Sequence, residues 1–114
     1  MNEHEHVDHL EAELLGAVLR DEDAFADVAL MVTAEDFRSP GVRAIWSALA
    51  DLFQDGKRIE ATTLAEELLR RGQIEDVGNY AYVGKLLDLS PTSAYAVQHA
   101  RMVRKPGAAS PRDA

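Results

Sequence analysis

The sequence contains no cysteine among its 114 residues. This absence excludes disulfide bonds, thiolate metal sites and cysteine nucleophiles, and it fits a cytoplasmic protein. No apolar run approaches the roughly 18 residues that a membrane-spanning helix needs. The acidic, histidine-rich start of the chain also differs from a signal peptide, which begins basic and then turns apolar. We therefore expect a cytoplasmic protein without a membrane partner.

The motifs of common enzyme chemistry are also missing. The sequence has no phosphate-binding glycine-rich loop, no GxxxxGK[ST] segment, no HExxH pair and no GxSxG elbow. Acidic residues such as Glu66 and Glu67 are spread over predicted helix faces, where caps and solubilising charge are the usual roles. We predict no catalytic residue, no cofactor and no metal ligand, and therefore no enzymatic activity.

Basic residues are few relative to acidic ones. Twelve Lys and Arg oppose 20 Asp and Glu, which gives a net charge of −8. Phosphate backbones repel such a chain, so binding of duplex DNA by the whole surface is disfavoured. Two basic pairs, Lys57 with Arg58 and Arg70 with Arg71, support an alternative hypothesis, a small nucleic-acid-binding regulator. The simpler interpretation of Arg70 and Arg71 is a charge match to the C-terminal end of a helix.

Both ends of the chain are polar. His4, His6 and His9 could ligate zinc or nickel, but their spacing matches no closed structural metal site. We interpret residues 1–7 as a flexible tail, and a histidine-tail metal enzyme is only a third hypothesis. Residues 106–114 begin with a proline and are small and polar, so we expect a second disordered tail.

The longest amphipathic segment lies at residues 40–54. Its apolar residues recur at helical spacing and include the only Trp: Val42, Ile45, Trp46, Leu49, Leu52 and Phe53. Pro40 suits the first turn of a helix, Ser39 is a candidate N-cap, and Asp55 with Gly56 marks a turn. We predict a helix around which the others pack.

Apolar periodicity predicts five further helices, at residues 8–20, 22–31, 62–71, 80–88 and 92–104. Asp21 is the expected cap of the second of these.

Several residues around these helices have specific expected roles. Thr33 with Asp36 forms a candidate capping box before a core residue, Phe37. Thr63 and Glu66 form another, and Leu64, Leu68 and Leu69 are expected to point inward. Gly16, inside the first helix, either permits the close approach of another backbone or is simply tolerated there at some cost in helix stability.

Four stretches together resemble the N-terminal domain of replicative DNA helicases of the DnaB type. They are LLGAVL at 14–19, EDFRSP at 35–40 with IW at 45–46, TLAEELLRRG at 63–72, and a last stretch from Gly78 through Tyr82 and PTSA at 91–94 to RMVR at 101–104. The resemblance covers residues 8–105. It implies an all-α, compact orthogonal bundle of about six helices.

The same resemblance implies a protein interaction module rather than an ATPase. Its implied partners are primase, a full-length replicative helicase or a loader protein, with a homodimer as a further arrangement and nucleic acid contacted only indirectly. We expect the partner surface at the basic end of the last helix, where Arg101 and Arg104 lie, together with Tyr95.

The sequence departs from the family pattern in three respects. Val42 replaces a histidine, and Tyr95 replaces an asparagine. Family members also continue into a helical hairpin, a linker and a RecA-like ATPase domain. The present sequence instead stops soon after residue 105, so we expect neither a motor nor helicase activity from this chain alone.

Overall fold

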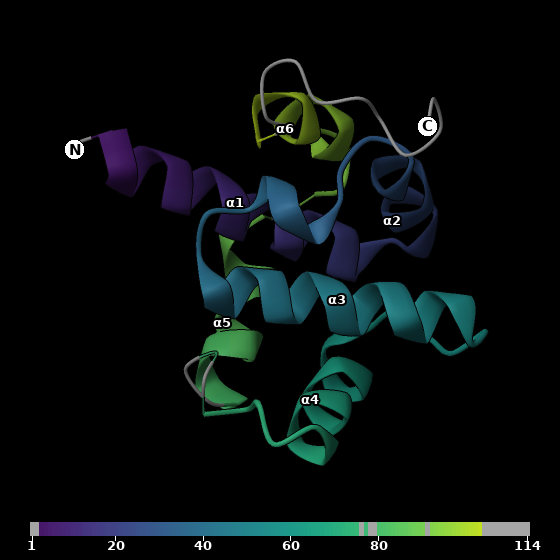
Figure 1. Cartoon of the computed structure of the whole chain (residues 1–114). Coiled ribbons are helices and arrows are strands. Elements are labelled where there is room, and N and C mark those ends of the chain that lie inside the picture. Colours follow the sequence, from purple (N-terminus) through teal and green to yellow (C-terminus); the bar gives the residue numbers. More distant parts are fainter. Residues whose placement is uncertain (1–2, 76, 78–79, 91, 104–114) are drawn as a thin grey trace.

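The predicted helix at residues 40–54 is present and lies between the other helices in Figure 1. The helix that most of the others pack against is, however, the first helix of the chain and not this one, so that part of the prediction is wrong. The computed structural model describes residues 3–75, 77, 80–90 and 92–103. In it, α3 spans Pro40–Gln54, with Pro40 in the first turn and Asp55 at the C-cap. Gly56 then turns the chain with a φ of 73°. The buried side chains of α3 are Val42, Ile45, Trp46, Ala48, Leu49 and Leu52.

Five further α-helices and one short 3-10 helix complete the described part of the chain. They are α1 (Glu3–Arg20), α2 (Glu22–Ala29), η1 (Ala34–Asp36), α4 (Ala61–Arg70), α5 (Tyr80–Leu89) and α6 (Ala96–Val103). α2 and α6 lie on one side of α3, and α4 and α5 lie on the other (Figure 1). α1 packs against α2, α3, α5 and α6. The prediction of a compact all-α bundle of about six helices is confirmed.

Gly16 lies where α1 crosses α5, and of its two interpretations the close approach is confirmed. A Cβ atom at this position would overlap the carbonyl oxygen of Leu86 and lie 3.0 Å from its carbonyl carbon. Hydrogen bonds hold the same crossing together. The Ser90 hydroxyl donates to the Glu13 carbonyl at 2.5 Å, and the Arg20 guanidinium donates to the carbonyls at the end of α5.

The start of α1 differs from the prediction. The helix begins at Glu3 rather than at residue 8, so residues 3–7, predicted as a tail, form its first turns. These turns extend beyond the other helices (Figure 1). No proline or glycine interrupts residues 3–9, so nothing in the sequence stops the helix from starting early.

Two later helices also begin at other residues than predicted. α4 begins at Ala61, with Glu60 at its N-cap, so Thr63 and Glu66 do not form its capping box. α6 begins at Ala96 rather than at residue 92. Residues 92–95 form a turn instead, because the Ala94 N–H donates to the Thr92 hydroxyl at 3.1 Å. The predicted helix residue 104 and the predicted tail at 106–114 lie outside the described residues.

The other predicted caps are mostly present. Asp21 accepts a hydrogen bond from the Asp23 N–H at 2.9 Å and caps α2, which ends at Ala29 rather than at residue 31. The Thr33 N–H donates to the Asp36 carboxylate at 2.8 Å, as in a capping box. Ser39 occupies the N-cap position of α3, but its side chain makes no capping hydrogen bond.

The core contains the predicted residues, with two corrections. Phe37, Leu64 and Leu68 are fully buried. Leu69, expected to point inward, is 54% exposed because it lies off the stripe formed by Leu64 and Leu68. Phe53, expected on the buried stripe of the helix, is 39% exposed, although its ring lies 5.2 Å from that of Phe25 at a tilt of 55°. Among the described residues, no helix has the length and apolar character to cross a membrane.

Candidate interaction surfaces

The predicted partner surface lies along α6. Tyr95 immediately precedes this helix, and its side chain is 58% exposed. Gln98, Arg101 and Met102 are also exposed, and the helical repeat places all four on one side of α6. We call these four residues the α6 surface. The opposite side packs on α1 and α2 through its buried residues Ala96, Ala100 and Val103. Arg104, predicted at the same surface, lies outside the described residues.

The predicted basic residues Arg70 and Arg71 lie in an ion-pair network that joins α4 to α3. Both guanidinium groups donate to the carboxylate of Glu67, Arg70 at 2.5 and 3.1 Å and Arg71 at 2.7 Å. Arg71 also donates to Asp51 of α3 at 2.7 Å. Gly72 follows with a φ of 72°, as predicted for a residue just past the helix end.

Glu67 is the centre of this network and not the solvated charge that the sequence suggested. It is only 8% exposed. The hydrogen bonds from Arg70 and Arg71 lower the pKa of Glu67 from its ordinary value of 4.5 to about 2, although burial acts in the opposite direction. The same interactions raise the pKa of both arginines. The charge of this pair of arginines is therefore largely matched within the domain.

The four predicted nucleic-acid residues are only partly brought together. Lys57 lies with Arg70 and Arg71 at a polar cavity of about 240 Å³, which Asp51 and Glu67 also line. Arg58 lies beyond this cavity, 85% exposed and 3.8 Å from Glu60. Acidic groups thus accompany the basic ones at this site.

The histidines that the structure describes are near one carboxylate. Glu13 of α1 lies 2.6 Å from the Nε2 atom of His9 and 3.4 Å from that of His99 on α6. The arrangement therefore connects α1 with α6. The side chains of His4 and His6 lie outside the described residues.

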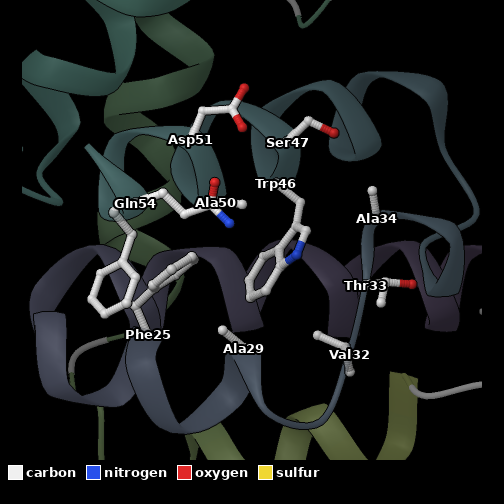
Figure 2. Close-up of a pocket in the computed structure, with 11 residues that line it drawn as sticks. Phe25, Ala29, Val32, Thr33, Ala34, Trp46, Ser47, Ala50, Asp51 and Gln54 are labelled. Atoms are coloured by element: carbon white, nitrogen blue, oxygen red, sulfur yellow. The ribbon is translucent and has the colours of Figure 1, made fainter. Parts of the chain in front are cut away.

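A third surface was not predicted from the sequence. It is an open apolar groove of about 340 Å³ between α2 and α3, which we call the α2–α3 groove (Figure 2). Its lining residues are Phe25, Ala29, Val32, Thr33, Ala34, Trp46, Ser47, Ala50, Asp51, Phe53 and Gln54. The alanines within otherwise large apolar faces were the available signal, because small side chains leave space between two helices.

The aromatic residues of this groove belong to a continuous cluster. The ring centroids of Phe25 and Trp46 are 4.9 Å apart, and those of Phe25 and Phe53 are 5.2 Å apart. Phe37 extends the cluster into the core, 5.3 Å from Trp46. The apolar wall of the groove is therefore fixed by core packing.

Together, these features define a class of protein: a small helical domain whose described residues offer surfaces for partners. Comparison with known proteins agrees. The family model for the DnaB-like helicase N-terminal domain matches residues 3–105. The chain belongs to this family.

Individual relatives give the same result. The chain is 36% identical over 93 residues to the replicative DNA helicase DnaB of Mycobacterium leprae, and 32% identical over 93 residues to that of Leifsonia xyli subsp. xyli. Each match covers 82% of this chain but only 15% and 20% of the respective helicase. The chain thus spans a fifth or less of the length of these relatives.

A solved structure confirms the fold. The crystal structure of the N-terminal domain of DnaB helicase from Mycobacterium tuberculosis matches with a TM-score of 0.82 and 34% sequence identity. The match covers 84% of this chain and 67% of that one. The resemblance stated from the sequence is therefore confirmed for the family and for the fold.

Proposed function

We propose that this chain is a non-enzymatic protein interaction module of DNA replication. The observation that supports the proposal is the family match over residues 3–105, which corresponds to the N-terminal part of replicative helicases and not to an ATPase domain. Its proposed partners are primase, a full-length replicative helicase or a loader protein, encountered in the cytoplasm.

The α6 surface is the proposed contact. It exposes a tyrosine, a methionine and an arginine on one side of a helix that is firmly packed on its other side. Tyr and Arg are enriched among the residues that dominate binding energy at protein interfaces, and Met adapts to irregular apolar partners. Tyr95 and Arg101 therefore offer both apolar area and charge.

The test is a titration of the chain against the helicase-binding domain of primase from the same source, with light scattering to determine the mass of the complex. We expect saturable binding. Replacement of Tyr95 and Arg101 by Ala should weaken it by about tenfold or more. Arg58→Ala is the matched control, because Arg58 is 85% exposed and lies away from α6.

Two results would contradict this proposal in different ways. Unchanged affinity of the Tyr95→Ala and Arg101→Ala double variant would exclude the α6 surface but leave the module role intact. An absence of binding to primase, to the full-length helicase and to the loader would overturn the role itself.

A further inference from the structure

The α2–α3 groove is a predominantly apolar concave surface formed by described residues. Phe25 is fully buried and Trp46 is 3% exposed, so both contribute a firm floor and wall. Phe53 also lines the groove and is 39% exposed. Figure 2 shows Ala29 and Ala50 facing each other across the opening, where their short side chains leave the space free.

The geometry fits a helix better than an extended strand. Most of the groove lining belongs to two helices, whose interior backbone N–H and C=O groups are hydrogen-bonded within each helix, and Val32, Thr33 and Ala34 complete it. Apolar grooves between helices accept amphipathic helices, which insert side chains at i, i+3, i+4 and i+7. Because the aromatic wall is already packed, little ordering cost accompanies binding.

The charge around the groove determines the chemistry of the partner. Residues 21–56 build both walls and contain eight acidic and two basic residues, which gives −6 of the chain's net −8. α2 has Glu22, Asp23 and Asp27 and no basic residue, although the helical repeat places Asp23 and Asp27 on the side of α2 opposite Phe25, so they contribute to the field and not to the lining. Asp51 lies in the groove itself, 58% exposed, although Arg71 is bound to it. Such a field attracts cations and repels phosphate backbones.

We propose that the α2–α3 groove binds a basic amphipathic helix of a partner protein, with the apolar face of that helix against Ala29, Ala50 and Phe53, over the buried Phe25 and Trp46, and its Lys and Arg residues toward Asp51 and the other acidic residues of the surrounding segment. This contact uses residues other than those of the α6 surface. The groove proposal does not depend on which replication protein binds the α6 surface. Either proposal can therefore be wrong while the other holds.

The test uses a defined helical peptide of about 18 residues, labelled with fluorescein, with Leu on one face, Lys on the other and no Trp. Fluorescence anisotropy reports its binding to the full chain. The emission of Trp46, the only Trp, reports whether an unlabelled copy of the peptide reaches the groove. We expect saturable binding at low salt, accompanied by a change in Trp46 emission.

Two groove variants and one matched control locate the contact. Ala50→Arg and Ala29→Arg place a bulky cation in the opening, at half-buried positions, and should each weaken binding about tenfold or more. Ala81→Arg adds the same charge at an exposed position of α5, which packs on α1 and α4, and should change affinity less than about twofold. Thermal denaturation checks that each variant is folded. If Ala50→Arg does not fold, the binding result of Ala29→Arg decides the test.

Three outcomes would overturn the proposal. One is an absence of binding by the Lys peptide. Another is equal weakening by the groove variants and by Ala81→Arg, because binding would then follow net charge alone. The third is equal binding of a peptide that has the same Leu face and Glu in place of Lys.

Discussion

Gly16 is a position where adding a single methyl group should destabilise the domain. A Cβ atom there would overlap the carbonyl oxygen of Leu86, which is backbone and cannot rotate away. We expect Gly16→Ala to lower the free energy of unfolding by about 1–3 kcal/mol, in spite of the higher helix propensity of Ala. Urea denaturation followed by circular dichroism measures this change.

Gly84 provides the matched control for that substitution. It lies within α5, and a Cβ atom there would meet no heavy atom within 4 Å. Gly84→Ala should therefore raise stability by about 0.5–1 kcal/mol. If Gly16→Ala proved as stable as Gly84→Ala, the close crossing of α1 and α5 would be wrong.

Single residues also show where sequence analysis succeeds and where it stops. Asp21 and Phe37 were assigned correctly, and the close approach at Gly16 was one of two interpretations, because a glycine inside a helix, a cap and an aromatic after a turn leave local signals. The burial of Glu67 and Glu11 left no such signal. Both are buried acids, and Glu11 accepts a hydrogen bond from the Arg38 N–H, 27 positions along the chain, at 2.7 Å. Only the tertiary fold supplies the partner of Glu11, whereas Arg70 and Arg71 follow Glu67 at the i, i+3 and i, i+4 spacing of helical ion pairs.

At the scale of elements, Glu67 should make the stability of the C-terminal end of α4 depend on pH, because Glu67 holds Arg71, which in turn donates to Asp51 of α3. The pKa of Glu67 is about 2 in the folded domain and 4.5 ordinarily. The stabilisation that its carboxylate provides is therefore fully present above pH 4.5 and is lost as the pH falls toward 2. We expect Glu67→Gln to be less stable than the native domain at pH 7. The difference should shrink between pH 4.5 and 2, as measured by urea denaturation over that range.

Glu66 supplies the control for this measurement. It neighbours Glu67 on α4 but is exposed, so Glu66→Gln should change stability little at any pH. A stability difference for Glu67→Gln that stayed constant from pH 7 to pH 3 would show that the carboxylate charge is not what stabilises the end of α4.

The existence and type of the elements were predictable, whereas the surfaces between them were not. Apolar periodicity identified all six helices, and α3 ends at the predicted residue. The α2–α3 groove escaped prediction because periodicity indicates which face of a helix is apolar but not how far the next helix stands from it. Phe53 illustrates the limit, since its position on the apolar stripe suggested burial and its neighbours leave one side open.

At the scale of the whole molecule, charge argues against the alternative function of nucleic-acid binding. The chain carries −8, and Arg70 and Arg71 are already bound by Glu67 and Asp51. A phosphate would have to compete with these carboxylates and approach against the overall field. We therefore expect no binding of single-stranded or duplex DNA, even at low salt, in a fluorescence anisotropy titration.

The double variant Glu67→Gln with Asp51→Asn makes this expectation sharper. It keeps the shape of both side chains but frees the two arginines, so any latent affinity for phosphates should emerge in the variant and not in the native chain. Salt-dependent DNA binding by the native chain, abolished by Arg70→Ala and Lys57→Ala, would instead establish the regulator hypothesis. We expect no DNA binding by the native chain, because its arginines are paired with Glu67 and Asp51. Binding a phosphate through these arginines would leave the buried Glu67 carboxylate without its partners, which is costly.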